Sequence, residues 1–161
     1  MKKTEKTNVM RILDQKKIPY GSYDYTQSGV ISGLEVAGVL GQDPHRVFKT
    51  LVTVGASGKN YVFVIPSCGE LNLKRAAKTV GEKSIEMLKA KELLPLTGYV
   101  HGGCSPIGMK KLFPTTVHQT AGDFETIFFS AGKIGYQVEL PLSFLEKVIP
   151  LQLGDVCDLE E

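Results

Sequence analysis

Two strand-like runs joined by a short turn constrain the fold more than any other feature of this sequence. Residues 47–54 read Val-Phe-Lys-Thr-Leu-Val-Thr-Val, and residues 61–65 read Tyr-Val-Phe-Val-Ile. Both runs are rich in β-branched and aromatic residues, which favour strands. The segment between them runs from Gly55 to Asn60 and is typical of a turn. The sequence therefore predicts a β-hairpin.

Lys49 interrupts the apolar pattern of the first run. Side chains alternate along a strand, so Lys49 shares a face with Val47 and Leu51. A hydrated ammonium group between apolar neighbours is costly unless it reaches a partner or an open pocket. We therefore treat Lys49 as a candidate functional residue. Two structural explanations stay open: a lysine that protects a sheet edge, and one whose stem covers apolar surface while its head stays in water.

Helix and strand signals alternate along the rest of the chain. Predicted helices follow the capping residues Thr7, Ser32, Asn72 and Ser143, with one more near residues 89–94. Further strands are predicted at 115–118, 126–129 and 136–140, and the tail from 151 to 159 is expected to add one edge strand. This order predicts an α+β fold with a mixed, largely antiparallel, barrel-like sheet and packed helices.

Composition limits the number of domains and the function classes. A chain of 161 residues with 42% hydrophobic and 22% charged residues predicts one globular domain over 1–161. Its 19 Lys and Arg against 17 Asp and Glu give a net charge of +2, which is too small to indicate nucleic-acid binding by itself. Neither a signal-peptide core nor a run of about 20 apolar residues is present, so we expect a cytoplasmic protein with no membrane partner.

The cysteines and histidines do not form a recognisable metal-binding pattern. Cys68, Cys104 and Cys157 lie far apart, without a Cys-x-x-Cys pair or a nearby histidine at ligand spacing. We expect neither a metal site nor a disulfide framework. Cys104 lies in a glycine-rich loop and could be read as a nucleophile. The preferred interpretation is a small buried thiol, because no spacing identifies a base for it.

The loop from His101 to Gly108 is the second candidate site. It reads His-Gly-Gly-Cys-Ser-Pro-Ile-Gly, and such a backbone can approach a ligand closely and present N–H groups to an ester carbonyl or a phosphate. It lacks the Gly-Lys-Ser/Thr ending of a P-loop, and no dinucleotide-binding fingerprint follows a strand. The sequence therefore argues against a kinase, an NTPase or a dinucleotide enzyme, and we expect no cofactor.

Four segments, taken in order, resemble the YbaK/EbsC family of trans-editing aminoacyl-tRNA deacylases. They are residues 48–51 (Phe-Lys-Thr-Leu), 71–78 (Leu-Asn-Leu-Lys-Arg-Ala-Ala-Lys), 102–108 (Gly-Gly-Cys-Ser-Pro-Ile-Gly) and 130–135 (Ser-Ala-Gly-Lys-Ile-Gly). The resemblance extends over nearly the whole chain. It is greatest to the branch that removes cysteine mischarged on proline tRNA.

The resemblance implies a compact barrel-like domain related to the editing insertion of bacterial prolyl-tRNA synthetases. It assigns the family's catalytic lysine to Lys49. It also implies that substrate contacts come from Tyr25, Ser32, Thr50, Gly102, Gly103, Cys104, Ser105, Pro106 and Ser130. One position departs from the family pattern, because Ser32 stands where related proteins carry an aromatic pocket residue.

The implied reaction needs little from the protein beyond orientation and charge. An aminoacyl ester is already activated, so the site has to hold it and stabilise the developing oxyanion. In the cysteine branch, the resemblance implies that the thiol of the bound cysteine attacks its own ester, releasing a cyclic thiolactone and free tRNA. Lys49 would then act through binding and electrostatics rather than as an acid or base.

The expected partner is the acceptor end of aminoacylated tRNA, with prolyl-tRNA synthetase as a second candidate partner. Recognition of a single-stranded end by a small domain would add a few phosphate contacts. Candidates are Lys74, Arg75, Lys78, Lys110, Lys111 and Lys133, although an ordinary solvated surface charge is the preferred interpretation of any one of them taken alone. Cysteinyl-tRNA(Cys) is a further expected substrate. The alternatives are a deacylase for alanine or proline and an inactive domain that binds tRNA or a synthetase as a regulator.

Overall fold

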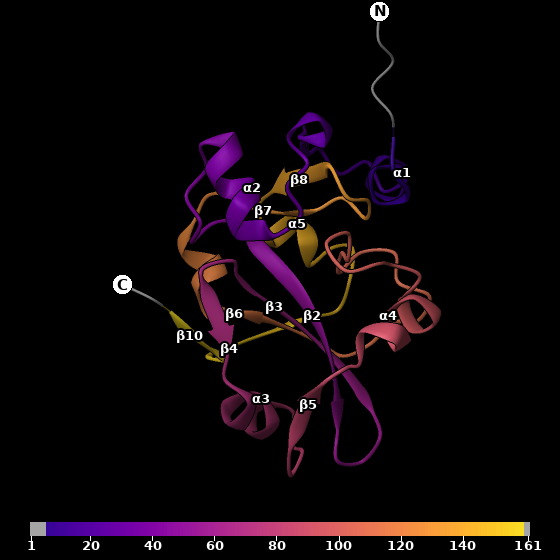
Figure 1. Cartoon of the computed structure of the whole chain (residues 1–161), viewed down its shortest axis with the longest axis vertical. Coiled ribbons are helices and arrows are strands. Elements are labelled where there is room, and N and C mark those ends of the chain that lie inside the picture. Colours follow the sequence, from indigo (N-terminus) through magenta and orange to yellow (C-terminus); the bar gives the residue numbers. More distant parts are fainter. Residues whose placement is uncertain (1–5, 160–161) are drawn as a thin grey trace, which may run out of the picture.

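The computed structural model describes residues 6–159, and Figure 1 shows helices packed around short sheets. The helices are α1 (Asn8–Gln15), α2 (Gly33–Leu40), α3 (Leu73–Val80), α4 (Ala90–Thr97) and α5 (Leu142–Leu145). Two 3₁₀ turns cover Thr26–Ser28 and Gln119–Asp123. Within this part of the chain, no helix is long and apolar enough to cross a bilayer.

A five-stranded sheet forms the centre of the molecule. Its strands are β2 (Phe48–Gly55), β3 (Asn60–Pro66), β5 (Ile85–Met87), β6 (Thr115–His118) and β9 (Gln152–Gly154), in the spatial order β5-β2-β3-β6-β9. The pairs β5–β2 and β2–β3 are antiparallel, whereas β3–β6 and β6–β9 are parallel. The central sheet is therefore mixed.

Two smaller antiparallel sheets complete the fold. The first contains β1 (Gly21–Asp24), β8 (Tyr136–Leu140) and β7 (Ile127–Ser130), and a single bridge between Val47 and Phe128 connects it to the segment before β2. The second pairs β4 (Gly69–Leu71) with β10 (Cys157–Leu159). None of the three sheets closes on itself, so the barrel-like arrangement is open.

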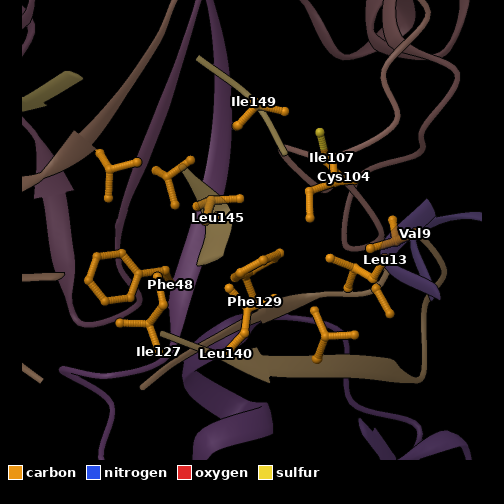
Figure 2. Packing of buried hydrophobic residues seen from close by; sticks show 14 of the residues in the cluster. Val9, Leu13, Phe48, Cys104, Ile107, Ile127, Phe129, Leu140, Leu145 and Ile149 are labelled. Atoms are coloured by element: carbon orange, nitrogen blue, oxygen red, sulfur yellow. The ribbon is translucent and has the colours of Figure 1, made fainter. Parts of the chain in front are cut away.

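Alternation along β2 and β3 gives the central sheet two buried faces. Phe48 and Val64 belong to the main core, where Figure 2 shows Phe48 with Phe129, Ile127 and Leu140. The opposite face carries Phe63 and other apolar residues against α3. Burying both faces explains why β3 reads as a continuous apolar run.

The sequence predicts most of these elements correctly. The α+β class, the hairpin of β2 and β3, and the caps at Thr7, Ser32 and Asn72 are confirmed, each cap accepting the backbone N–H of the third residue of its helix. The cap predicted at Ser143 is wrong. Pro141 occupies the N-cap instead, because its fixed φ of −66° directs the chain into a helix that begins at Leu142.

The tail prediction is also wrong in its number of strands. Residues 151–159 form two short strands, β9 and β10, which join different sheets. Between them the Val156 N–H donates to His118 Nδ1, and the chain turns from one sheet toward the other. The hydrophobicity pattern of residues 151–159 does not indicate a partner as distant in sequence as His118.

Candidate functional site

One cavity of about 400 Å³ lies beside strand β2 and collects residues from distant parts of the chain. Its walls come from the segment that leads into α2, from β2, from the end of β5 and the start of α4, from the loop after Tyr99, and from β7. Seven of the predicted site residues line it: Tyr25, Ser32, Lys49, Thr50, Gly102, Cys104 and Ser130. The lining does not include Gly103, Ser105 or Pro106.

Lys49 is half-buried and lies against the turn between β3 and β4. Its Nζ donates to the carbonyl oxygen of Ser67 at 3.4 Å, and none of the five ion pairs recorded within residues 6–159 includes Lys49. Ser67 is held in turn, because its N–H donates to the Val47 carbonyl and its hydroxyl donates to the Pro44 carbonyl. The cavity therefore contains a positioned positive charge without an acidic partner.

Strand β2 presents its backbone edge to the cavity. On one side, β3 pairs with the whole length from Phe48 to Val54. On the other side, β5 pairs only with Thr53–Gly55, and the contact with β7 is at Val47. Every residue from 47 to 52 lines the cavity, which a single face of an alternating strand could not do. The cavity is thus a gap in the hydrogen-bonded ladder.

The flanking hydrogen bonds show which backbone groups point into this gap. Phe128 N–H donates to the Arg46 carbonyl, and Leu88 N–H donates to the Val52 carbonyl, at the two ends of the gap. Backbone groups of alternate residues point to the same edge of a strand. Thr50 therefore directs both its N–H and its C=O into the cavity.

The Thr50 side chain adds an unsatisfied polar atom. Its Oγ1 is buried and has no hydrogen-bond partner among the described residues, one of three side-chain atoms in that state. A buried hydroxyl without a partner costs about 1–3 kcal/mol, so the free protein carries an energetic cost beside the cavity. By contrast, the buried Thr53 hydroxyl on the same strand donates to the Tyr61 carbonyl at 2.9 Å.

These two threonines predict opposite effects of the same substitution on stability. Thr50→Val removes a hydroxyl that the free protein leaves unpaired, so we expect the free energy of unfolding to stay level or rise by up to about 1 kcal/mol. Thr53→Val removes a hydrogen bond and should lower it by about 1 kcal/mol, leaving the Tyr61 carbonyl unpaired on that side. Urea unfolding of both variants measures the difference. A Thr50→Val protein as destabilised as Thr53→Val would contradict the unpaired hydroxyl.

The polar residues at one end of the cavity are held by local caps and turns. Ser32 caps α2, accepting the Glu35 N–H and donating to its carboxylate. Ser130 Oγ accepts the Gly132 N–H and so begins the turn between β7 and β8. Tyr25 is tied to the same turn, because its N–H donates to the Gly135 carbonyl at 2.8 Å. Burial raises the pKa of the Tyr25 hydroxyl, so it is a neutral hydrogen-bonding group.

The glycine-rich loop approaches the cavity through Gly102. This residue has φ +88°, a left-handed conformation, and a Cβ placed on it would overlap Cγ2 of Ile31. Gly103 packs on the backbone of the β7–β8 turn, and its N–H donates to the Val100 carbonyl. Ser105 is buried and accepts the Ile107 N–H. Part of the loop's N–H array is therefore used inside the loop rather than offered to a ligand.

Cys104 lines the cavity as a protonated thiol. Burial raises its pKa to about 12, so the thiolate fraction at pH 8 is on the order of 10⁻⁴. A thiol acts as a nucleophile through its thiolate, and this environment disfavours that form. The structure thus supports the interpretation of Cys104 as a packing residue of the main core, and Figure 2 shows it beside Ile107.

This difference in burial predicts an order of thiol alkylation. Cys68 is partly exposed, whereas Cys104 and Cys157 are buried and have pKa values raised to about 12 and about 11. Treatment of the folded protein with iodoacetamide at pH 8 should modify Cys68 first and leave the other two largely unmodified until the protein unfolds. Peptide mapping by mass spectrometry measures each site. Rapid modification of Cys104 would restore it as a candidate nucleophile.

Several cavity residues were not predicted from the sequence. Gln137 lies in the middle of β8, is 2% exposed, and exchanges two amide hydrogen bonds with Gln42 at 2.8 and 3.0 Å. A glutamine inside an apolar strand was a usable signal that the sequence interpretation missed. His101, the first residue of the predicted candidate loop, also lines the cavity, although the family resemblance assigned it no substrate contact. The remaining walls, such as Met87 and Leu93, are apolar and carry no local signal.

None of the predicted basic residues is among those that line the cavity. Lys74 and Lys78 of α3 line a shallow groove with Lys83 and Glu82. Arg75 instead bonds to Asp158 at 2.8 Å and to the Cys157 carbonyl, so it holds β10 against α3. The others are Lys110, whose Nζ donates to the Pro95 carbonyl, the exposed Lys111, and Lys133, which lies over the ring of Tyr136.

Comparison with known sequences places this chain among editing domains. A family model described as the aminoacyl-tRNA editing domain matches residues 32–148. A protein of Enterococcus faecalis (strain ATCC 700802 / V583), provisionally named Cys-tRNA(Pro)/Cys-tRNA(Cys) deacylase EbsC, is 50% identical over 160 residues. The alignment covers 98% of this chain and 96% of that relative.

Comparison with solved structures confirms the fold. A crystal structure of a hypothetical protein superposes with a TM-score of 0.86 at 20% identity and covers 94% of this chain and 100% of the other. The crystal structure of a protein provisionally described as a trans-editing enzyme for prolyl-tRNA synthetase gives a TM-score of 0.82 at 20% identity. That match covers 96% of this chain and 99% of the other.

Proposed function

This chain belongs to the aminoacyl-tRNA editing domain family and is an aminoacyl-tRNA deacylase, and we propose that it removes cysteine mischarged on proline tRNA. Cysteinyl-tRNA(Cys) is the second substrate that we propose. The observation that supports this function best is the cavity itself. There a lysine without an acidic partner, an open strand edge and the glycine-rich loop meet in a space of about 400 Å³, a size typical of small-ligand sites.

In the proposed reaction the substrate supplies its own nucleophile. The sulfur of the bound cysteine attacks its ester carbonyl, the bond from that carbonyl to the ribose oxygen breaks, and the thiol proton ends on the ribose hydroxyl. The products are a cyclic thiolactone and free tRNA. The protonated Cys104 does not compete as a nucleophile, and the side chains lining the cavity are mostly apolar, which favours reaction within the ester over attack by water.

Lys49 contributes charge to this reaction. An ammonium group in a partly desolvated wall strengthens electrostatic interactions with a developing oxyanion or with the sugar-phosphate end of the substrate. Its hydrogen bond to the Ser67 carbonyl is long, at 3.4 Å. Replacing that carbonyl by a substrate oxygen would break no ion pair, because the carbonyl is uncharged.

The main alternative is a deacylase for alanine or proline. It is favoured by Ser32, the N-cap of α2 and part of the cavity wall, because a serine occupies less of the cavity than an aromatic ring would. A cavity larger than the cysteine side chain could admit other small residues, since one methylene changes binding by only about 1–3 kcal/mol. An inactive domain that binds tRNA or a synthetase is the remaining alternative.

A panel of aminoacyl-tRNAs decides between these functions. We expect fast cleavage of cysteinyl-tRNA(Pro) and little cleavage of alanyl-, prolyl- or seryl-tRNA, because residues without a thiol cannot form the thiolactone. Lys49→Ala should lower kcat/KM by about 10²-fold or more, and Lys49→Arg should also be impaired, since a planar fork replaces a compact ammonium group.

The matched control for Lys49 is Lys59→Ala, which removes an exposed lysine from the turn of the same hairpin and should leave the rate unchanged. Circular dichroism shows whether each variant is folded. Efficient cleavage of alanyl- or prolyl-tRNA would favour the alternative substrates, and no cleavage of any member would favour the inactive domain.

The α3 groove offers a path for the tRNA backbone next to the cavity. Strand β5 separates the two, because Ile85 lines the groove while Met87 lines the cavity, about 7 Å further along the strand. Lys74, Lys78 and Lys83 give the groove a positive charge that suits phosphates. Arg75 is less available for this role, because it is bonded to Asp158.

Charge reversal in the groove tests this path. The double variant Lys74→Glu/Lys78→Glu should raise the KM for aminoacyl-tRNA and reduce the slope of log KM against log salt by about 1–2, with kcat nearly constant. The control is Arg11→Glu/Lys16→Glu, the same charge change on α1 and its C-cap residue, and α1 lies at the opposite end of the long axis from α3 in Figure 1. Equal effects of the two double variants would place the tRNA elsewhere.

A substrate of this class also suggests the protein's setting. Aminoacyl-tRNA is made and used in the cytoplasm, so that is the location we propose. Prolyl-tRNA synthetase is the proposed source of the mischarged substrate and a candidate for direct association.

A further inference from the structure

Thr50, near the middle of the ladder gap along β2, presents the donor and the acceptor that one residue of a neighbouring strand would pair with. The gap lies between the Arg46 carbonyl, bonded to Phe128, and the Val52 carbonyl, bonded to Leu88, a distance of about 20 Å along an extended chain. Between these points, Thr50 directs a donor and an acceptor side by side into the cavity. In an antiparallel sheet, such a residue exchanges two N–H···O bonds with a single residue of the next strand.

An aminoacyl ester carries the same pair of groups as a residue of such a neighbouring strand. Its α-ammonium group donates hydrogen bonds, and its ester carbonyl accepts them. We propose that the aminoacyl group binds in the gap as a one-residue strand, with its α-ammonium group donating to the Thr50 carbonyl and its ester carbonyl accepting from the Thr50 N–H. This inference deepens the proposed function and rests on it for the identity of the substrate.

The surroundings of the gap suit this occupant. The backbone groups of Phe48 point to the same edge of β2 as those of Thr50. The Phe48 carbonyl therefore lies near the proposed position of the α-ammonium group and offers a second acceptor. Among the described residues, no Asp or Glu lines the cavity, so the charged acceptors that an ammonium group prefers are missing there. Backbone carbonyls of the strand edge are available instead. Lys49 would repel a second cation, which favours placing the ammonium group toward the strand edge and away from the lysine head.

This arrangement separates two kinds of recognition. The strand edge reads the part common to all aminoacyl esters, namely the free α-amino group and the carbonyl, and it does so through backbone atoms. The apolar walls and Gln137 then surround the side chain, which differs between substrates. Strand addition of this kind gives affinity through main-chain bonds and leaves specificity to the side-chain pockets.

The first experiment compares two stable analogues that differ only in the α-amino group. One is cysteine joined by an amide bond to 3′-amino-3′-deoxyadenosine, and the other is the 3-mercaptopropionyl counterpart, which keeps the thiol but lacks the amino group. Calorimetric titration of the full chain should give a Kd about tenfold or more weaker for the second analogue, because it loses hydrogen bonds from a charged donor. Equal Kd values, or no binding of either analogue at millimolar concentration, would overturn the inference.

The second experiment observes the backbone group directly. Hydrogen exchange measured by NMR should show the Thr50 N–H exchanging faster than that of Leu51, whose backbone points toward β3. Adding the cysteinyl analogue should slow exchange at Thr50 and leave Leu51 nearly unchanged, so Leu51 is the internal control. An unchanged Thr50 rate in the saturated protein would overturn the proposed pairing.

These measurements also distinguish failure of the inference from failure of the proposed function. Both use binding of an uncleavable analogue, so they give an answer even if cysteinyl-tRNA proves not to be the substrate. Cleavage of cysteinyl-tRNA together with equal analogue affinities would keep the function and reject the strand-edge site. Tight, amino-dependent binding without cleavage would reject the function and keep the site.

Discussion

The incomplete pairing of strand β2 is the constraint on which the rest of the site depends. One edge of β2 is fully paired with β3, while the other is paired only at its ends, by β5 and by the bridge to β7. Unpaired backbone groups in a protein interior are costly, so such a gap persists only where a ligand or water can reach it. The elements around the gap therefore form walls without closing it, and this arrangement creates the cavity.

The same gap explains how a single strand can carry several site functions at once. Lys49 and Thr50 are neighbours in sequence, and their side chains leave the sheet on opposite faces. At an ordinary position in a sheet, one ligand could not reach both. Because the ligand approaches the edge, the lysine on one face and the backbone of its neighbour both border the same space. A ligand at the strand edge can thus contact the backbone and the side chains of neighbouring residues, whereas a ligand on one face contacts the side chains of alternate residues.

The sequence predicted the elements whose causes are local. Alternation and turn residues were sufficient for the hairpin, and side-chain caps were sufficient for the starts of α1, α2 and α3. The short strands β1, β4 and β5 were missed because three or four residues carry little pattern of their own, and their partners β8, β10 and β2 supply most of the stabilisation. The erroneous cap at Ser143 shows the converse, since a matching motif was overruled by the proline that precedes it.

The site was predictable to a similar extent. Residues in short motifs, such as Lys49, Gly102 and Ser130, do line the cavity. Gln137 and the apolar walls were missed because their place depends on which strands meet, which no local spacing encodes. Gly103, Ser105 and Pro106 share a motif with Gly102 but do not line the cavity, because Gly103 packs on the β7–β8 turn and Ser105 is bonded inside the loop. The short motif does not distinguish these residues from Gly102.

The position of Gly102 has a consequence for how substrate preference can evolve. This residue meets two demands at once, because its left-handed backbone shapes the loop and its missing side chain leaves room for Ile31. A substitution of Gly102 would therefore disturb the loop and Ile31 together. New specificities are then more accessible at Ser32, where another capping residue of different volume can replace the serine while α2 keeps its N-cap. The glycine fixes the shape of the cavity wall, and the capping residue beside Ile31 is the position at which that wall can vary.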